Sequence, residues 1–335
     1  MDEVFPRKNP TSEIPIRVSV VIPARNEEIH VGDLLASLEA LDFSREHLEI
    51  IVVNHDSNDG TSAIARKAGA RVVDKHGGSI ASARNAGARQ AAGDVIAFID
   101  ADCTVAKDWL NVALPHFSDP RVGAVGRSWP LVPAEPSTWA RSILRKQAEI
   151  QAGSSRGRWL SSGNMLVRRH VFFEVGEFDE ALGTCEDVDL SYRIASKYLI
   201  IEDLKIRWWH HGEPRTFWQL FRKELWRGRD GLLGVARHGF RLDEMPSLIL
   251  PLYFLLTLAL FLSSLLVVSF GRWQLPLAAC AGAAFFIPLF LLAAFRSLRT
   301  GGLRYVGHFT VFYAVYFLAR GFSPFYAWPN IKRQS

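Results

Sequence analysis

Up to about residue 245, the chain alternates short apolar runs with longer stretches in which apolar residues recur at helical spacing. Runs rich in β-branched residues predict strands at 17–23, 48–53, 71–74 and 95–99. The helix predicted after the first strand has its apolar residues on one face: Val31, Leu34, Leu35 and Leu38. Strands that alternate with helices indicate an α/β fold with a mostly parallel sheet, and such sheets bind ligands at the carboxyl ends of their strands.

Clusters of polar residues follow three of these predicted strands, at 25–28, 54–59 and 100–102. Because the carboxyl ends of parallel strands share one edge of the sheet, the clusters are expected to lie close together. In the third cluster, Asp100 and Asp102 lie one residue apart, and two carboxylates at this spacing can share a divalent cation or a metal-bound diphosphate. Taken alone, a solvated turn or a helix cap is the alternative for this pair.

The last part of the chain is dominated by long apolar runs. The runs 248–270 and 273–295 contain no charged side chain. A helix of that length can cross a hydrocarbon core about 30 Å thick. A third run, 305–328, is interrupted by His308 and Arg320. It is expected to cross as well, with a re-entrant or interfacial helix as the alternative.

The flanks of these runs predict an orientation. Residues 1–15 are charged and contain no apolar stretch, so they do not read as a secretory signal. The predicted loop between the second and third spans carries Arg296, Arg299 and Arg304, which favours the cytoplasmic side. We therefore expect a multi-pass protein of the inner (cytoplasmic) membrane whose N-terminal domain faces the cytoplasm. Residues 216–245 precede the first span with interleaved apolar and basic residues, which indicates an interfacial helix; an ordinary surface helix is the alternative.

Composition excludes some other classes. The three cysteines, Cys103, Cys185 and Cys280, are too widely spaced for a disulfide framework or a zinc pattern. The formal net charge is +5, and no nucleic-acid motif accompanies it. Beside apolar spans, such a charge indicates contact with anionic lipid or phosphate rather than nucleic acid.

Two further groups are candidates for chemistry. Glu186 and Asp187 lie in a run of acids, and either could accept a proton from a hydroxyl within hydrogen-bond reach. A charged loop that caps the following helix is the alternative. His210 or His211 could complete a metal shell with Asp102, and mixed oxygen and imidazole ligands suit manganese at least as well as magnesium.

Taken together, the motifs resemble one known family. The segments VSVVIPARNEE, VVNHDSNDGT, ARNAGARQAAGDVIAFIDADC, SSGNMLVRR, GEFDE and EDVDLSYR, in this order, resemble the family 2 glycosyltransferases over roughly residues 17–230. The resemblance implies a GT-A type domain, with a mostly parallel central sheet flanked by helices, followed by C-terminal transmembrane helices. The implied organisation is an N-terminal extension (1–15), a catalytic domain (16–215), the interfacial segment (216–245) and the transmembrane region (246–330).

The resemblance also implies a donor site. The nucleotide base and ribose would be lined by Pro23, Ala24, Arg25 and Glu27. The segment Asn54 to Asp56 would close the other side of the base, and Arg84 would lie near the donor phosphates. Asp100, with Ala101 beside it, would contact the ribose or the metal.

The remaining implied roles concern the metal and the acceptor. Asp102 would be the main metal ligand, with His210 near the metal and diphosphate. Gly163 and Asn164 would border the sugar and the acceptor. Asp187, next to Glu186, would be the catalytic base of an inverting displacement.

Two departures from the family pattern affect specificity. Asn54 and His55 stand where the family usually has an Asp that bonds the base, and an amide can both donate and accept. Base identity therefore stays open between a UDP- and a GDP-sugar. The Q-x-x-R-W signature of processive polysaccharide synthases is missing from 219–229, which favours transfer of a single sugar.

The sequence thus predicts a glycosyltransferase that moves one sugar from a nucleotide-sugar donor to a hydroxyl or phosphate acceptor. A divalent metal, Mn²⁺ or Mg²⁺, is the expected cofactor, and a lipid-linked acceptor and membrane lipid are the expected partners. A membrane-anchored nucleotidyltransferase is one alternative, although it would usually need a Gly-rich basic loop after the first strand. A non-catalytic membrane scaffold with a degenerate nucleotide-binding domain is the other.

Overall fold

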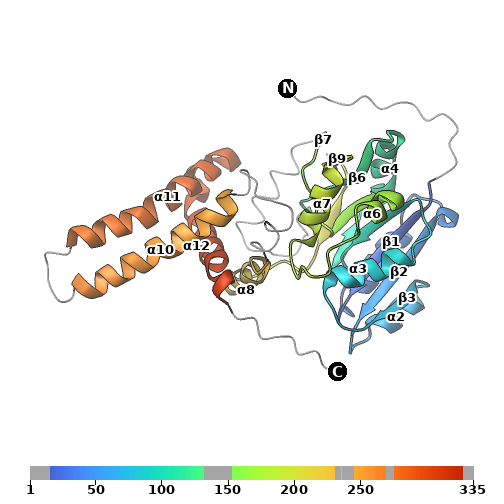
Figure 1. The fold of residues 1–335 in the computed structure, drawn as a ribbon, viewed down its shortest axis with the longest axis horizontal. Helices are drawn as coiled ribbons and strands as arrows, with labels where there is room; N and C mark the ends of the chain where they lie inside the picture. Colours follow the sequence, from blue (N-terminus) through green and yellow to red (C-terminus); the bar gives the residue numbers. More distant parts are fainter. Residues whose placement is uncertain (1–15, 132–152, 231–234, 236–244, 269–274, 327–335) are drawn as a thin grey trace. The chain divides into compact units, whose positions relative to one another are not determined.

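The computed structural model describes residues 16–131, 153–230, 235, 245–268 and 275–326 (Figure 1). Outside these residues lie the predicted extension 1–15, most of 231–244, and residues 269–270, 273–274 and 327–328 of the predicted spans. Contacts divide the chain into two compact units. The N-terminal unit contains Met1–Glu135 and Ala148–Gly212, and the C-terminal unit contains Pro136–Gln147 and Glu213–Ser335.

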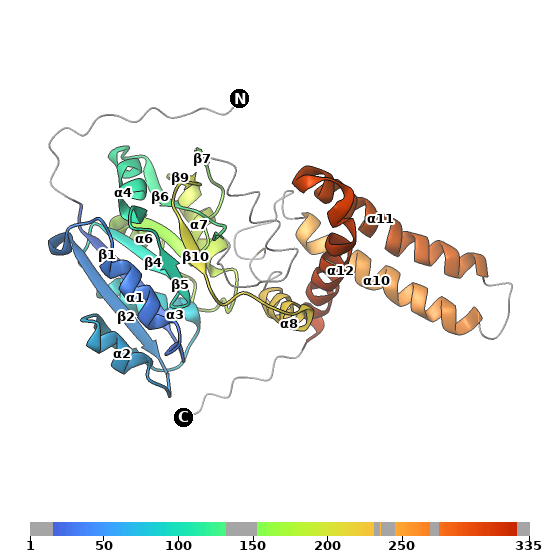
Figure 2. The ribbon, with the colours of Figure 1, turned by 180° about the vertical axis from the view of Figure 1, so that it is seen from behind.

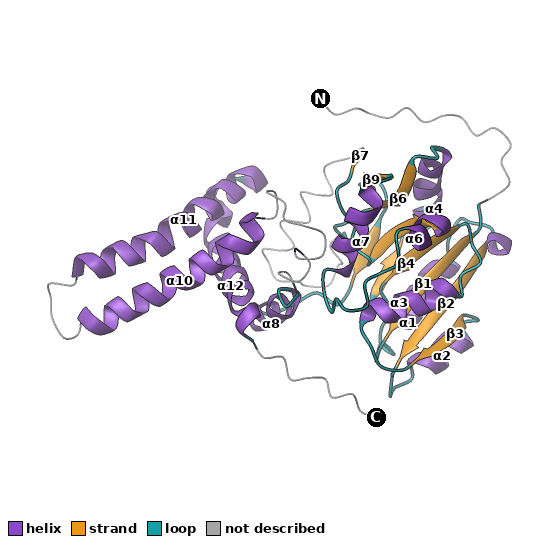
Figure 3. Ribbon diagram, in the orientation of Figure 1, coloured by secondary structure: helices purple, strands orange, loops and turns teal. Residues whose placement is uncertain are grey.

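Within the described part of the N-terminal unit, eight strands form a mixed sheet in the order β3-β2-β1-β4-β8-β6-β9-β7 (Figures 1 and 3). The strands are β1 (Val18–Ala24), β2 (Leu48–His55), β3 (Arg71–Lys75), β4 (Val95–Ile99), β6 (Val122–Gly126), β7 (Ser154–Arg156), β8 (Asn164–Arg168) and β9 (Leu199–Asp203). The first four are parallel, and β8 runs antiparallel to both β4 and β6. The α/β prediction and its four strands are confirmed.

Helices cover both faces of this sheet (Figures 1 and 2). They are α1 (Val31–Glu39), α2 (Thr61–Lys67), α3 (Ile80–Arg89), α4 (Trp109–Ala113), α6 (Arg169–Glu174) and α7 (Glu186–Ala195), with short 3₁₀ turns at Arg45–His47 and Leu114–Ser118. Strand β1 is buried along its whole length because β2 and β4 flank it. On one face of the sheet Val18, Val20, Ile22 and Ala24 belong to one apolar cluster, and on the other face Val21 belongs to a second, as the pleat requires.

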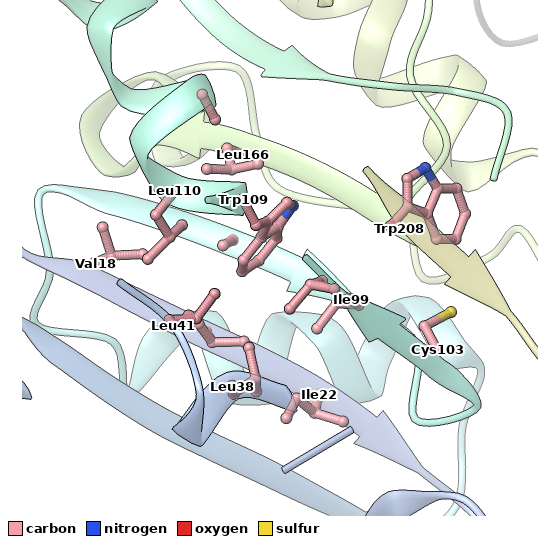
Figure 4. Packing of buried hydrophobic residues seen from close by; sticks show 14 of the residues in the cluster. Val18, Ile22, Leu38, Leu41, Ile99, Cys103, Trp109, Leu110, Leu166 and Trp208 are labelled. Atoms are coloured by element: carbon pink, nitrogen blue, oxygen red, sulfur yellow. The ribbon is translucent and has the colours of Figure 1, made fainter. Parts of the chain in front are cut away.

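Figure 4 shows the cluster under α1, where Leu38 and Trp109 pack over Ile22 and Ile99. On the opposite face, α3 lies very close to the sheet. A Cβ added at Gly87 would clash with Val21 and come within 2.8 Å of Val53. The small residues of α3 therefore let its backbone approach the strands, which brings the polar side chains of this helix to the sheet edge.

A buried hydrogen bond joins helix α4 to the start of β8. The indole Nε1 of Trp109 donates to Asn164 Oδ1 at 2.9 Å, and both residues are fully buried. Asn164 was predicted to border the sugar and the acceptor. Its side chain bonds Trp109 inside the core and fixes the start of β8 beside the end of β4, and the role beside the sugar and acceptor stays a prediction.

The C-terminal unit is helical in the residues described. Its elements are α8 (Phe217–Arg227), α10 (Met245–Val268), α11 (Leu275–Gly301), α12 (Val306–Phe322) and 3₁₀ turns at Leu303–Tyr305 and Ser323–Phe325. Aromatic and aliphatic side chains of α10, α11 and α12 form its core. A capping box between Thr216 and Gln219 begins α8. Glu224 of α8 is buried and contacts Arg227 at 3.0 Å and Arg320 of α12 at 3.1 Å, so α8 is fixed to α12 by charge as well as by packing.

Two described helices are long and apolar enough to cross a membrane, by length and composition alone: Met245–Val267 and Leu275–Arg299. Only 22% and 28% of their most apolar windows are buried. Helix α12 is shorter and would extend over about 26 Å. The predicted third crossing and the interfacial position of 216–245 stay predictions.

The Trp109–Asn164 bond supplies a test of the core. Asn164→Ala leaves the buried indole N–H without its partner, which should destabilise the N-terminal unit by about 1–3 kcal/mol. Asn111→Ala removes one bond of an exposed amide to Asp42 O and serves as the control. Thermal unfolding should show a lower midpoint for Asn164→Ala only. Equal midpoints for the two variants would contradict the structural role of Asn164.

Candidate active site

Polar side chains from distant parts of the sequence meet at the carboxyl edge of the sheet. Ala24 at the end of β1 pairs with Asn54 near the end of β2, and Asp100 directly follows β4. Because β8 runs antiparallel to β4, its first residue pairs with Ile99 and brings Gly163 to the same edge. A Cβ added at Gly163 would lie 3.1 Å from Asp100 Oδ2, so only glycine leaves this carboxylate undisturbed.

The loop after β1 is tied to the loop after β2. The backbone N–H of Asn26, which has φ 56°, donates to Ser57 Oγ at 3.1 Å. The N–H of Glu27 donates to Thr61 Oγ1 at 2.8 Å. These bonds fix the ARNEE segment in one conformation beside the buried Pro23 and Ala24, whereas the side chain of Arg25 stays exposed.

The amide of Asn54 has partners on both sides. Its Nδ2 donates to Asp74 Oδ1 at 2.8 Å, and its Oδ1 accepts from Ser57 N at 3.2 Å. An Asp at position 54 would place two carboxylates against each other, so the neighbouring strand explains the departure from the family pattern. Asp56 bonds His76 Nδ1 and Gly77 N, and the Gly77 N–H is the main cause that lowers the pKa of Asp56.

A buried guanidinium joins the β4 edge to α7. Arg84 of α3 is 3% exposed and donates to Asp100 Oδ1 at 2.6 Å and to Glu186 Oε1 at 2.7 Å. The guanidinium carbon Cζ of Arg84 also lies 5.7 Å from the centroid of the Phe178 ring. Arg84 was predicted to lie near the donor phosphates. Two of its N–H groups are engaged with carboxylates instead, and that role stays a prediction.

Asp187 lies beside this ion pair in the first turn of α7. Its Oδ2 accepts from Ser162 N at 3.2 Å and its Oδ1 accepts from its neighbour Val188 N at 2.9 Å. Burial is the main cause that raises the pKa of Asp187, and burial followed by the charge of Asp187 raises the pKa of Glu186. Glu186 is bound by Arg84, so Asp187 is the carboxylate better suited to accept a proton.

A two-stranded sheet brings a histidine to Asp102. Strand β5 (Cys103–Val105) pairs antiparallel with β10 (Trp208–His210), with His210 opposite Cys103. The N–H of His211 donates to Asp102 O at 2.8 Å, and His210 Nε2 lies 3.3 Å from Asp102 Oδ2. A cation with ligand bonds of about 2.1 Å at right angles needs donors about 3 Å apart, so this pair has the spacing of two adjacent ligands.

The described residues do not contain a complete protein shell for a metal. No three His, Cys, Asp or Glu side chains gather closely enough within them. Asp100 accepts from Arg84 through Oδ1, and its predicted share in the cation stays a prediction. A cation at Asp102 and His210 would therefore need further oxygen ligands from water or a diphosphate, as is usual for Mg²⁺ beside phosphates.

Glu27 has a property that its sequence position does not reveal. Burial raises its pKa to about 7, and the negative charges of Asp102, Asp100 and Asp59 add to this shift. The loop after β1 thus carries a carboxyl group that responds to charge at the candidate cation site. The sequence pattern also did not predict two residues that contact the candidate site through their backbone. Ser162 N donates to Asp187, and the backbone of Gly212 approaches Asp102 so closely that a Cβ would clash with the Asp102 carboxylate. Their backbone roles leave no motif of their own.

Comparison with known proteins identifies the class of this domain. Residues 19–176 match the family described as Glycosyl transferase family 2. This match contains β1 to β8 with Asp100 and Asp102, and it ends before Asp187 and His210. It shows that residues 19–176 belong to a family 2 glycosyltransferase domain, and the mixed α/β sheet is that of the GT-A fold, as the motifs predicted.

Individual relatives agree with this class. Glycosyltransferase AglE of Haloferax volcanii is 30% identical over 191 residues, which are 55% of this chain and 62% of that protein. Beta-monoglucosyldiacylglycerol synthase of Synechocystis is 27% identical over 195 residues, which are 53% of this chain and 40% of that protein. The chain thus spans less than two thirds of the length of these relatives.

A solved structure resembles the fold over nearly the whole chain. The mannosyltransferase PcManGT of Pyrobaculum calidifontis, in complex with GDP-Man and Mn²⁺, gives a TM-score of 0.64 at 21% identity. The similarity covers 97% of this chain and 90% of that one.

The shifted pKa of Glu27 gives a pH-dependent stability in metal-free buffer. Between its ordinary value of 4.5 and about 7, the folded state keeps a proton that the unfolded state releases, so ionisation opposes folding and the free energy of unfolding falls as pH rises. Glu27→Gln removes this titration. In thermal unfolding with EDTA from pH 5 to 8, the melting temperature of the variant should rise relative to that of the wild type as pH rises. Glu28→Gln is the neighbouring control, and a pH-independent difference for Glu27→Gln would contradict the shift.

Proposed function

We propose that the protein is a membrane-anchored glycosyltransferase that moves a single sugar from a nucleotide-sugar donor to a hydroxyl or phosphate acceptor. The observation that carries this proposal is the meeting of Asp102, His210, Asp100 and Asp187 at one edge of a family 2 domain. Four acids and bases from three separate segments, the turn after β4, α7 and β10, are not needed to stabilise a solvated loop. Their convergence suits the transfer of a group bound to a diphosphate.

The donor would be held through its diphosphate. Asp102 and His210 supply one hard oxygen and one imidazole donor 3.3 Å apart, and this set fits Mn²⁺ or Mg²⁺ with phosphate oxygens as the other ligands. A divalent cation bound there would offset the charge that develops on the departing diphosphate. PcManGT was solved with GDP-Man and Mn²⁺, which supports a nucleotide-sugar and a divalent cation here. Base identity remains between uridine and guanosine.

The acceptor would be activated by Asp187. The acceptor oxygen forms a bond to the anomeric carbon of the donor sugar. At the same time the bond from that carbon to the diphosphate breaks on the opposite face, and the nucleoside diphosphate leaves. The acceptor proton passes to the Asp187 carboxylate, whose raised pKa brings it closer to the working pH of a general base. Attack from the face opposite the leaving group inverts the anomeric configuration.

A lipid-linked acceptor suits the C-terminal unit. Its two long apolar helices are mostly unburied, as expected for helices that face lipid. An enzyme anchored in this way reaches an amphiphile confined to the same membrane. Beta-monoglucosyldiacylglycerol synthase, a relative over about half of the chain, is named for a lipid product. We propose an inner-membrane, multi-pass arrangement with the family 2 domain in the cytoplasm.

A nucleotidyltransferase would use a similar α/β site, but the first loop of this chain is an acidic ARNEE segment rather than a Gly-rich basic one. The two reactions release different products: a glycosyltransferase releases nucleoside diphosphate, and a nucleotidyltransferase releases pyrophosphate. Product analysis with a labelled nucleotide-sugar and Mn²⁺ separates them, and a non-catalytic scaffold would yield neither product.

The role of Asp187 can be tested by Asp187→Asn. Because the amide cannot accept the proton, transfer should fall by about 10²- to 10⁴-fold while nucleotide binding changes little. Asp94→Asn, just before β4 at the opposite edge of the sheet, is the matched control. Initial rates and nucleotide-induced thermal shifts would be measured on the same samples. An equal loss of donor affinity and rate would remove Asp187 from the role of base.

The cation ligands can be tested by Asp102→Ala and His210→Ala. Ligands that bind the native state raise its melting temperature. The increase produced by a nucleoside diphosphate should depend on Mn²⁺ in the wild type and lose that dependence in both variants. Asp108→Ala removes a surface carboxylate that pairs with Arg207 and should leave the shift intact. Unchanged Mn²⁺ dependence in Asp102→Ala would exclude it from the ligand set.

A further inference from the structure

Two tryptophans form an aromatic surface on the acceptor half of the sheet. Trp129 follows β6 and Trp159 precedes β8, and their rings meet edge to face with centroids 6.2 Å apart and planes at 76°. The Trp129 side chain is 58% exposed, although large apolar side chains in the described part of this unit are mostly buried. A rigid aromatic side chain left in water beside a catalytic edge is a common feature of binding sites.

The loop that carries Trp129 is held by buried polar groups. Arg127 is 1% exposed and donates from Nε to Trp129 O at 2.8 Å and from Nη1 to Leu204 O at 2.7 Å. Ser128 Oγ donates to Trp159 O at 3.1 Å, which joins the two tryptophan-bearing segments. The ring of Trp129 is therefore presented on a fixed backbone, so a ligand that stacks on it meets little ordering cost.

The same segments lead directly to the proposed catalytic groups. Next to Trp159, Leu160 N donates to Ser191 Oγ at 3.1 Å, and Ser191 Oγ donates to Asp187 O at 2.7 Å. On the other side, Trp208 of β10 donates from its indole to Arg127 O at 2.9 Å, two residues before His210. The tryptophan pair is thus connected by short hydrogen-bonded links to both Asp187 and the strand that carries His210.

We propose that Trp129, supported by Trp159, is a binding site for a pyranose ring of the acceptor. This proposal rests on the proposed function and makes it more specific, because the acceptor would end in a sugar rather than in a bare lipid phosphate. One face of a pyranose presents C–H groups that pack on the electron-rich face of an indole, while its hydroxyl groups stay in water or reach Asp187. The nucleotide base and ribose are proposed to lie at the ends of β1 and β2, which leaves the β6–β8 side of the edge for the acceptor.

The experiment measures saccharide binding directly. The full chain is prepared in a detergent without a sugar headgroup. Saturation-transfer-difference NMR is recorded with methyl glycosides of glucose, galactose, mannose and N-acetylglucosamine. Spectra are taken without nucleotide and with UDP or GDP plus Mn²⁺. At least one glycoside should receive saturation on its ring C–H protons, and Trp129→Ala should weaken its binding about three- to tenfold. Trp129→Phe should retain part of the affinity, whereas Trp129→Leu, which keeps apolar area without a ring, should not.

Several results would overturn the site. One is the absence of saturation for every glycoside in protein whose melting temperature still responds to the nucleoside diphosphate. Another is equal binding by the wild type, Trp129→Ala and Trp129→Leu. If Trp129→Ala instead lowers affinity for anionic phospholipid vesicles and leaves glycoside binding unchanged, Trp129 contacts the bilayer and the proposal is wrong. Loss of the nucleotide response with glycoside binding intact would contradict the proposed function and leave the saccharide site standing.

Discussion

The buried guanidinium of Arg84 is the constraint on which the candidate site depends. It lies between Asp100 and Glu186, at 2.6 and 2.7 Å, and so connects the end of β4 to the first turn of α7. A buried cation with two carboxylate partners is strongly favoured over any arrangement that leaves one charge alone. Because Asp102 and Asp187 each follow a partner of Arg84 closely in sequence, this one residue fixes the separation between the proposed cation ligand and the proposed base.

Two departures from simple parallel topology complete the site. Strand β8 enters antiparallel between β4 and β6, which brings Gly163 against Asp100 and places Ser162 N on Asp187. The β5–β10 pair then returns a distant segment to Asp102 and adds His210. The edge is therefore built from parallel strands at one end and from the antiparallel β8 and the β5–β10 pair at the other.

The C-terminal unit differs from the sheet domain in how much of its apolar surface is buried. Its two long helices bury about a quarter of their most apolar windows, and by length and composition both are candidates to cross a membrane. Glu224 is a buried charge in this unit, and its burial is tolerated because Arg227 and Arg320 contact it from α8 and α12. Arg320, which interrupts the third apolar run in the sequence, thus binds α12 to α8 through Glu224.

Local pattern was enough to predict the strands at 17–23, 48–53, 71–74 and 95–99, the family of the domain and the acids that follow β4, because apolar periodicity and short motifs are properties of neighbouring residues. The partners of those acids are not local. Arg84 is separated from Glu186 by more than a hundred residues, Asn164 turns into the core to meet Trp109, and the pKa of Glu27 is raised by burial and by carboxylates from other strands. Only the packed sheet brings these groups within bonding distance, and only burial makes their charges interact strongly, so the chemistry of the edge was decided by tertiary structure.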